Sequence, residues 1–129
     1  MTITVTSALL DGLMAEARTA HPREACGLLF GSREAITFYR ATGNVHPAPR
    51  SHFEIDPQAL VDAHRAMRAG GPHLVGYYHS HPHGPPEPSA TDRALAAGDG
   101  MVWAIVGQGG VRLWRDDNAD FSALSYTVV

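Results

Sequence analysis

Lysine is absent from this chain of 129 residues, because all ten of its basic residues are arginines. The sequence therefore has no P-loop lysine, no Schiff-base lysine and no side-chain amine to which another protein could be attached. The arginines are scattered, and 13 acidic residues leave a formal net charge of −3. A basic stripe of the kind that binds nucleic acid is not expected.

Cysteine and long apolar runs are also scarce. Cys26 is the only cysteine, which excludes an internal disulfide framework and suits a reducing compartment. No apolar run approaches the length of a membrane span, and the first residues lack the basic segment of a secretory signal. We therefore expect a cytoplasmic protein with no membrane partner and no nucleic-acid partner.

The organisation of the chain predicts one domain over residues 1–129, since no repeat or low-complexity linker divides it. Apolar patterning predicts strands at residues 2–6, 25–31, 35–40, 53–55, 74–78, 101–106 and 111–114. Helices are expected after a Ser7 cap, after the Asp56-Pro57 start, and over Ser89–Ala97. Together these elements predict an α/β (α+β) fold with a single mixed sheet flanked by helices.

Two histidines at the end of an apolar strand are candidate metal ligands. His79 and His81 are two residues apart, so strand geometry sends both rings to one face. Asp92, at the head of the next predicted helix, could supply the third ligand that a catalytic zinc site needs beside an open position. His83 continues the alternate spacing, but Pro82 and Gly84 interrupt the strand there, which favours Asp92.

Each of these residues also has an ordinary structural interpretation. A His-x-His pair alone is weak evidence for metal. Ser89 and Asp92 resemble a capping box, in which a serine N-cap pairs with an acid three residues later, although such an acid could still bind metal. Glu24 by itself is a surface acid at the mouth of a strand, yet a glutamate that does not bind the metal could serve as general base in metal-assisted hydrolysis.

Taken together, the polar residues resemble the JAMM (MPN+) metallopeptidase family over nearly the whole chain. The residues that carry this resemblance are Glu24, Cys26–Gly31, the segment from Asn44 to Asp56-Pro57, and His79-Ser80-His81-Pro82 followed by Ser89 and Asp92. The ten-residue gap between the second histidine and the aspartate agrees with the family signature of a distant glutamate plus H-x-H-x10-D.

The resemblance implies a cytidine-deaminase-like JAMM/MPN architecture and one Zn²⁺ ion with a bound water. His79, His81 and Asp92 would bind the ion. Glu24 would act as general base on the water and return the proton to the leaving amine, and Ser89 would help to bind the tetrahedral oxyanion.

The compact, stand-alone prokaryotic members of the family are the most similar in size. The implied reaction is hydrolysis of the amide or isopeptide bond after the C-terminal glycine of a ubiquitin-like or sulfur-carrier protein with a Gly-Gly tail. Alternatives are an isopeptidase that removes ubiquitin-like proteins from lysine conjugates, a non-catalytic MPN scaffold, and an amidase for small molecules. The leaving group, the oligomeric state and occlusion of the site by loop 82–88 stay open at this stage.

Overall fold

The structure is a computed structural model that describes residues 2–129. Its strands are β1 (Thr2–Val5), β2 (Cys26–Gly31), β3 (Ala35–Thr42), β4 (Leu74–Ser80), β5 (Val102–Gly107), β6 (Gly110–Asp116) and β7 (Phe121–Val128). Its helices are α1 (Ser7–Ala20), α2 (Pro57–Arg68) and α3 (Ala90–Leu95). Within these described residues, no helix is long and apolar enough to cross a membrane.

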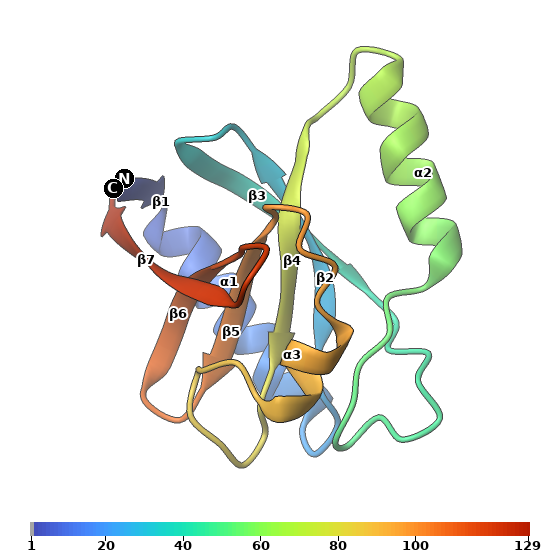
Figure 1. The fold of residues 1–129 in the computed structure, drawn as a ribbon, viewed down its shortest axis with the longest axis vertical. Helices are drawn as coiled ribbons and strands as arrows, with labels where there is room; N and C mark the ends of the chain where they lie inside the picture. The colour runs from blue at the N-terminus through green and yellow to red at the C-terminus, as the bar shows by residue number, and fades with distance from the viewer. Residues whose placement is uncertain (1) are drawn as a thin grey trace.

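All seven strands join one mixed sheet in the order β1-β3-β2-β4-β5-β6-β7, which confirms the predicted fold class. The sheet closes into a barrel because β1 pairs in parallel with both β3 and β7. The first and last strands therefore lie side by side (Figure 1). The sequence did not predict β7 or the closure, because no residue of β7 is fully buried and its apolar alternation is weak.

Helix α1 packs against strands β3 to β6 and covers the larger core cluster, to which it contributes Leu9 and Leu13. Its N-cap is Thr6, one residue earlier than predicted, since the Thr6 hydroxyl accepts a hydrogen bond from the backbone N–H of Leu9 at 3.0 Å. Helix α2 stands on the opposite side of the sheet (Figure 1) and buries Ala63 in a second cluster. The predicted Asp56 cap with Pro57 at its first turn is present.

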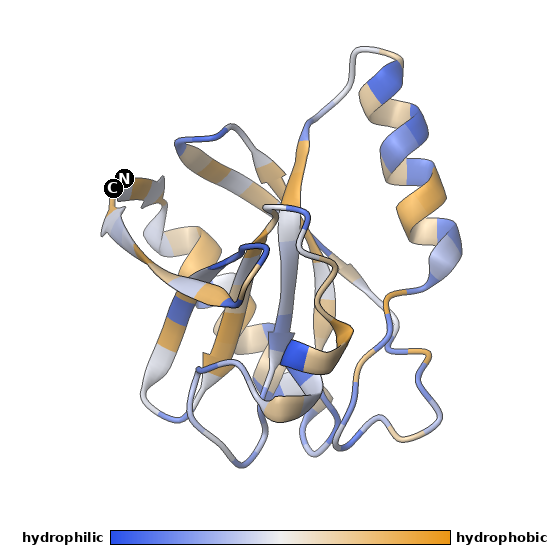
Figure 2. Ribbon diagram, viewed as in Figure 1, coloured by the Kyte–Doolittle hydropathy of each residue, from blue (hydrophilic) through white to orange (hydrophobic). Residues whose placement is uncertain are grey.

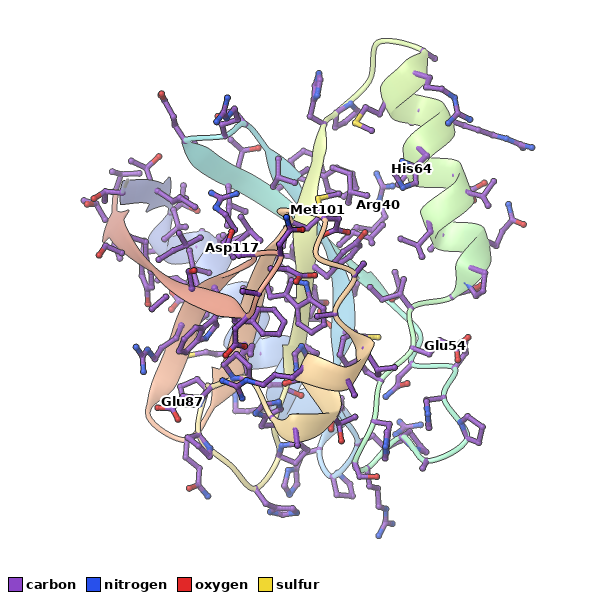
Figure 3. The ribbon with its side chains drawn as sticks, viewed as in Figure 1. Arg40, Glu54, His64, Glu87, Met101 and Asp117 are labelled. Atoms are coloured by element: carbon purple, nitrogen blue, oxygen red, sulfur yellow. The ribbon has the colours of Figure 1, made fainter. Side chains whose placement is uncertain are left out.

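The predicted strand at residues 53–55 is wrong. Only an isolated bridge joins Ile55 to Asn44, and residues 53 and 54 belong to loop 44–54. The backbone N–H of Glu54 donates to the side-chain oxygen of Asn44 at 3.1 Å, so a side chain replaces the strand partner that regular pairing would need. The Glu54 side chain points away from the barrel (Figure 3).

The third helix is shorter than predicted and ends at Leu95 rather than Ala97. The backbone N–H groups of Ala97 and Gly98 donate to the buried carboxylate of Asp116 at 3.0 and 3.1 Å. Those two bonds hold the chain outside helical geometry, because both donors are committed to β6.

Strand β4 lies at the centre of the sheet, antiparallel to β2 and parallel to β5. Leu74, Gly76 and Tyr78 on one face are buried, whereas Val75 and Tyr77 on the other face are half-buried. The strand continues to Ser80, so His79 lies inside it and His81 follows directly. Figure 2 shows the apolar colour of β4 giving way to hydrophilic colour at this end, beside the beginning of α3.

Candidate metal centre

The end of β4 and the first turn of α3 bring together the three side chains that the sequence singled out as ligands. The Nε2 atoms of His79 and His81 lie 3.0 Å apart. A carboxylate oxygen of Asp92 lies 3.2 Å from the first nitrogen and 3.1 Å from the second. Among the described residues, these are the three side chains whose ligand atoms converge, and the exposed His83 is not one of them.

His79 is fully buried between aromatic rings. Phe53 stacks on its imidazole with ring centroids 4.2 Å apart, and Trp103 meets it edge-on at 5.6 Å. Burial lowers the pKa of His79 despite the neighbouring carboxylate of Asp92. The ring is therefore held neutral, with a lone pair available for a metal ion.

His81 is partly exposed, and its hydrogen bonds define its tautomer. Its Nδ1 lies 2.9 Å from the backbone oxygen of Pro85. Because a carbonyl oxygen only accepts, Nδ1 donates to Pro85, which leaves Nε2 to donate to Asp92 or, in the neutral ring, to bind a metal ion. Burial opposes the charged form, but the contacts with Asp92 and Pro85 raise the pKa of His81 overall.

Asp92 is both a helix cap and part of the cluster. The Ser89 hydroxyl accepts the backbone N–H of Asp92 at 3.1 Å, while the Asp92 carboxylate accepts the backbone N–H of Ser89 at 2.9 Å. This is the predicted capping box. Burial favours the neutral acid, but hydrogen bonds from His79 and His81 outweigh it and hold the pKa of Asp92 well below its usual range.

The donor set fits a divalent cation. Tetrahedral coordination at bond lengths of about 2.0 to 2.1 Å places ligand atoms about 3.3 Å apart, close to the 3.0 to 3.2 Å found between these three atoms. With both Nε2 atoms unprotonated, two imidazole lone pairs and an ionised carboxylate would repel one another unless a cation lay between them, so a metal ion can replace the protons of the hydrogen bonds to Asp92. The arrangement is a candidate metal centre with two nitrogen ligands and one oxygen ligand.

Glu24 adjoins this centre without belonging to it. It lies just before β2, is only 7% exposed, and lines a cavity of about 360 Å³ together with His81 and Ser89. Burial raises the pKa of Glu24 to about 7, and the effects of His81, which lowers it, and Asp92, which raises it, are smaller. A carboxyl group with this pKa exchanges protons readily near neutral pH.

Comparison with known proteins places this geometry in a family. The model described as prokaryotic homologs of the JAB domain matches residues 6–117. The chain belongs to this family. Among the relatives of this prokaryotic JAB protein, the desampylase of Haloferax volcanii is 36% identical over 127 residues, covering 92% of this chain and 90% of the relative. A probable TtuB-protein conjugate cleaving protease of Thermus thermophilus is 40% identical over 106 residues, covering 78% and 70%.

Solved structures agree with this membership. A protein from Desulfitobacterium hafniense superposes with a TM-score of 0.83 at 28% identity, covering 99% of this chain and 93% of that one. A structure described as JAMM, a metalloprotease-like zinc site in the proteasome and signalosome, has a TM-score of 0.61 at 20% identity, covering 100% and 99%, and shows the shared fold. The resemblance to the JAMM family inferred from the sequence is therefore confirmed.

The structure of this JAB protein also contains site features that the sequence patterns did not assign. Phe53 stacks on His79 from a loop that was predicted as a strand. The hydroxyl of Ser80 accepts the backbone N–H of Ala25 at 2.8 Å and so ties the start of β2, next to Glu24, to β4. The sequence did offer one signal for the role of Ser80. Because it stands between His79 and His81, strand alternation sends its hydroxyl to the face opposite the two histidine rings.

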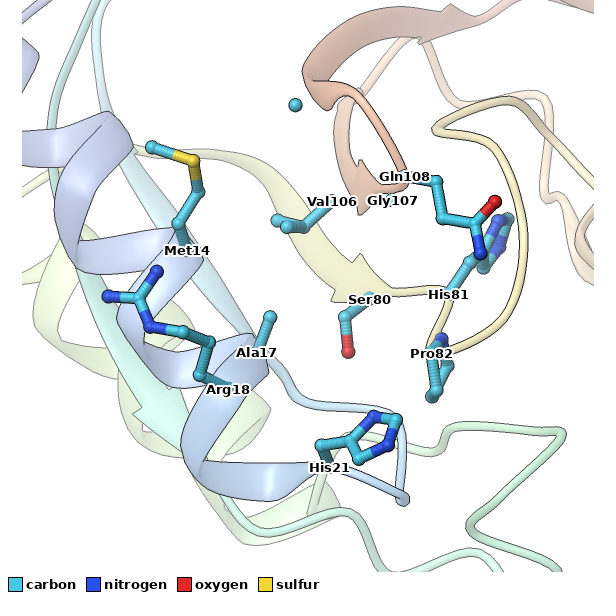
Figure 4. A pocket seen from close by; sticks show the side chains of 11 residues that line it. Met14, Ala17, Arg18, His21, Ser80, His81, Pro82, Val106, Gly107 and Gln108 are labelled. Atoms are coloured by element: carbon cyan, nitrogen blue, oxygen red, sulfur yellow. The ribbon is translucent and has the colours of Figure 1, made fainter.

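A second cavity, of about 460 Å³, lies beside the same end of β4 (Figure 4). It is lined by Met14 and His21 at the α1 side and by Gly107 at the end of β5, and His81 lines it as well as the first cavity. His81 and Pro82 line both cavities, so both spaces adjoin the metal centre.

Proposed function

We propose that this JAB-family protein is a zinc metallopeptidase that cleaves the amide or isopeptide bond after the C-terminal glycine of a ubiquitin-like or sulfur-carrier protein. The observation that carries the proposal is the convergence of His79, His81 and Asp92 beside the buried acid Glu24. The names of the relatives, desampylase and TtuB-conjugate cleaving protease, support this substrate class. A Gly-Gly tail fits the proposal because glycine allows close approach of the scissile bond to a recessed centre.

In this proposal, His79, His81 and Asp92 hold one zinc ion and leave a position for solvent. The bound ion would supply Lewis acidity and bring the pKa of a water ligand to about 7. Imidazole and carboxylate ligands at these separations suit zinc, and a structure of the same fold is described as a metalloprotease-like zinc site.

Glu24 is the proposed general base. Its carboxyl group lines the cavity next to His81, and its pKa of about 7 allows it to accept a proton from water and return it to the leaving amine. Ser89 is the proposed oxyanion donor. Its oxygen already accepts the backbone N–H of Asp92, which leaves the hydroxyl hydrogen free to donate to substrate.

A lysine isopeptide is the alternative form of the same reaction, and it differs only in the leaving group. A non-catalytic scaffold would need neither a buried glutamate nor three converging metal ligands, so the intact set of four favours an enzyme. A small-molecule amidase remains the third hypothesis, and simple amides therefore belong among the assay substrates.

The test combines metal content with cleavage of two adducts of a ubiquitin-like protein, one ending in Gly-Gly-amino acid and one joined to a lysine side chain. We expect wild type to contain about one equivalent of zinc and to release the Gly-Gly terminus, as measured by mass spectrometry. Glu24→Gln should keep the zinc and lose turnover, whereas His79→Ala should lose both. His73→Ala, an exposed histidine before β4, is the matched control. An active Glu24→Gln variant would contradict the mechanism.

A further inference from the structure

We propose that Asn44 is a positioning residue that fixes the proposed general base, Glu24, by fastening loop 44–54 to the segment before β2. The inference rests on the proposed function, because it concerns the geometry of the residue that moves the proton. It adds to that function a residue that does not touch metal or substrate and acts only through the backbone of Glu24.

The side chain of Asn44 uses both halves of its amide. Its Nδ2 donates to the backbone oxygens of Glu24 at 3.0 Å and His52 at 2.9 Å, with a longer contact to Pro49 at 3.4 Å. Its Oδ1 accepts the backbone N–H groups of residues 46 and 54, both at 3.1 Å. The two N–H bonds and the two oxygen lone pairs of the amide are all committed.

Glu24 is held by its backbone on both sides. Its carbonyl accepts from Asn44, and its N–H donates to the backbone oxygen of Pro49 at 2.7 Å. Both polar backbone groups of the residue therefore end in loop 44–54. The hydrogen bonds found among the described residues reach Glu24 through these backbone atoms, so the loop decides where its carboxylate lies.

The neighbouring residue carries the connection to the metal centre. Ala25 exchanges hydrogen bonds with Ser80, through the serine hydroxyl at 2.8 Å and the serine N–H at 3.0 Å. Glu24 thus lies between β4, which carries the two histidines, and the loop closed by Asn44. The same loop places Phe53 against His79. One amide side chain consequently links the proposed base to the surroundings of a proposed ligand.

Loss of the link between Asn44 and Glu24 should affect catalysis, because the rate of proton transfer depends strongly on the position of the general base. Displacement of a reacting group by about 1 Å can cost about a hundredfold in rate. Loss of the Asn44 donors frees the carbonyl of Glu24 and the carbonyl of residue 52, while the metal ligands keep their own hydrogen bonds to Pro85 and Ser89. Turnover should therefore fall without loss of metal.

Asn44→Asp is the informative variant, studied in the full chain at pH 8. The carboxylate keeps oxygen acceptors for residues 46 and 54 but presents no hydrogen to Glu24 or His52. Asn44→Ala removes both halves. The matched control is Asn118→Asp, which makes the same charge change at an exposed residue of the loop before β7.

The probe is a ubiquitin-like protein whose Gly-Gly terminus is joined to a fluorescent amine. We expect kcat to fall about tenfold to a hundredfold in both Asn44 variants, with KM within twofold and metal content unchanged. Amide hydrogen exchange at residues 24–26 should accelerate at least tenfold, whereas Asn118→Asp should match wild type in every measurement. Should Asn44→Ala fail to fold, Asn44→Asp carries the test alone.

The inference would be overturned by unchanged kcat, by a rise in KM alone or by loss of metal in Asn44→Asp. Amide hydrogen exchange does not depend on cleavage, so it tests this inference separately from the proposed function. If wild type leaves the probe uncut, the proposed function fails, and unchanged exchange at residues 24–26 in Asn44→Asp would overturn the tether independently.

Discussion

Replacement of Glu24 by glutamine is expected to abolish turnover and, in the metal-free protein, to increase stability at alkaline pH. Glutamine has nearly the same shape but no charge. Glu24 is 7% exposed in the wild type, and burial raises the pKa of its carboxyl group from 4.5 to about 7. The folded protein therefore disfavours the ionised acid, and the variant removes that cost.

The pH range follows from the two pKa values. Below the unfolded pKa of 4.5, both states carry the neutral acid and the two proteins should be equally stable. Between pH 4.5 and about 7 the unfolded chain ionises first, so wild type loses stability relative to Glu24→Gln. Above pH 7 the difference is complete. The pKa change sets an upper limit of roughly 3 kcal/mol, and solvent in the adjoining cavity lowers the expected value to about 1 to 2 kcal/mol.

Urea unfolding of chelator-treated protein at pH 4 and pH 8 measures this difference. Glu34→Gln, a substitution of an exposed acid in the turn between β2 and β3, is the matched control and should leave stability unchanged at both pH values. Excess zinc should reduce the gain at pH 8, because a nearby cation favours the ionised acid. Equal stability of wild type and Glu24→Gln at pH 8 would refute the reasoning.

Three further variants test the centre and its supports. Asp92→Asn should retain less than a tenth of the wild-type metal by elemental analysis, since an amide is a poor substitute for an ionised ligand, and full metal content would refute its ligand role. Gly76→Ala should cost about 3 kcal/mol or more in urea unfolding, because a Cβ there would lie 1.8 Å from the backbone oxygen of Val102 on β5; a cost below 1 kcal/mol would contradict this packing. Trp114→Phe should cost about 1 kcal/mol by removing the 3.0 Å hydrogen bond to the Pro86 oxygen, and unchanged urea unfolding would show that this bond does not contribute.

The local parts of the site could be predicted from the sequence because they depend on short spacings. Strand alternation places His79 and His81 on one face, and helix N-terminal chemistry explains Ser89 and Asp92. Proximity of Glu24 to this group came only from the family resemblance, since 55 residues separate it from the first histidine and no periodicity connects them.

The longer-range features had no comparable signal. Asn44 begins a segment that carries the family resemblance, but the sequence assigned it no role, because its five contacts exist only after the loop folds around it. The same contacts explain why residues 53–55, which have strand-like composition, do not form a strand. The conformation of residues 53–55 depends on whether their backbone groups bond to a side chain or to a neighbouring strand. That choice depends on tertiary structure, which the local sequence does not reveal.

Closure of the barrel by β1 has a consequence for biosynthesis. Val5 pairs with Ile36 on one side and with Val128 on the other. During translation β4, which carries His79, can pair early with β2, but β1 gains its second neighbour only after β7 has left the ribosome. Until then one side of β1 is an unprotected strand edge, so the nascent chain is most open to mispairing with other chains in the interval before β7 emerges.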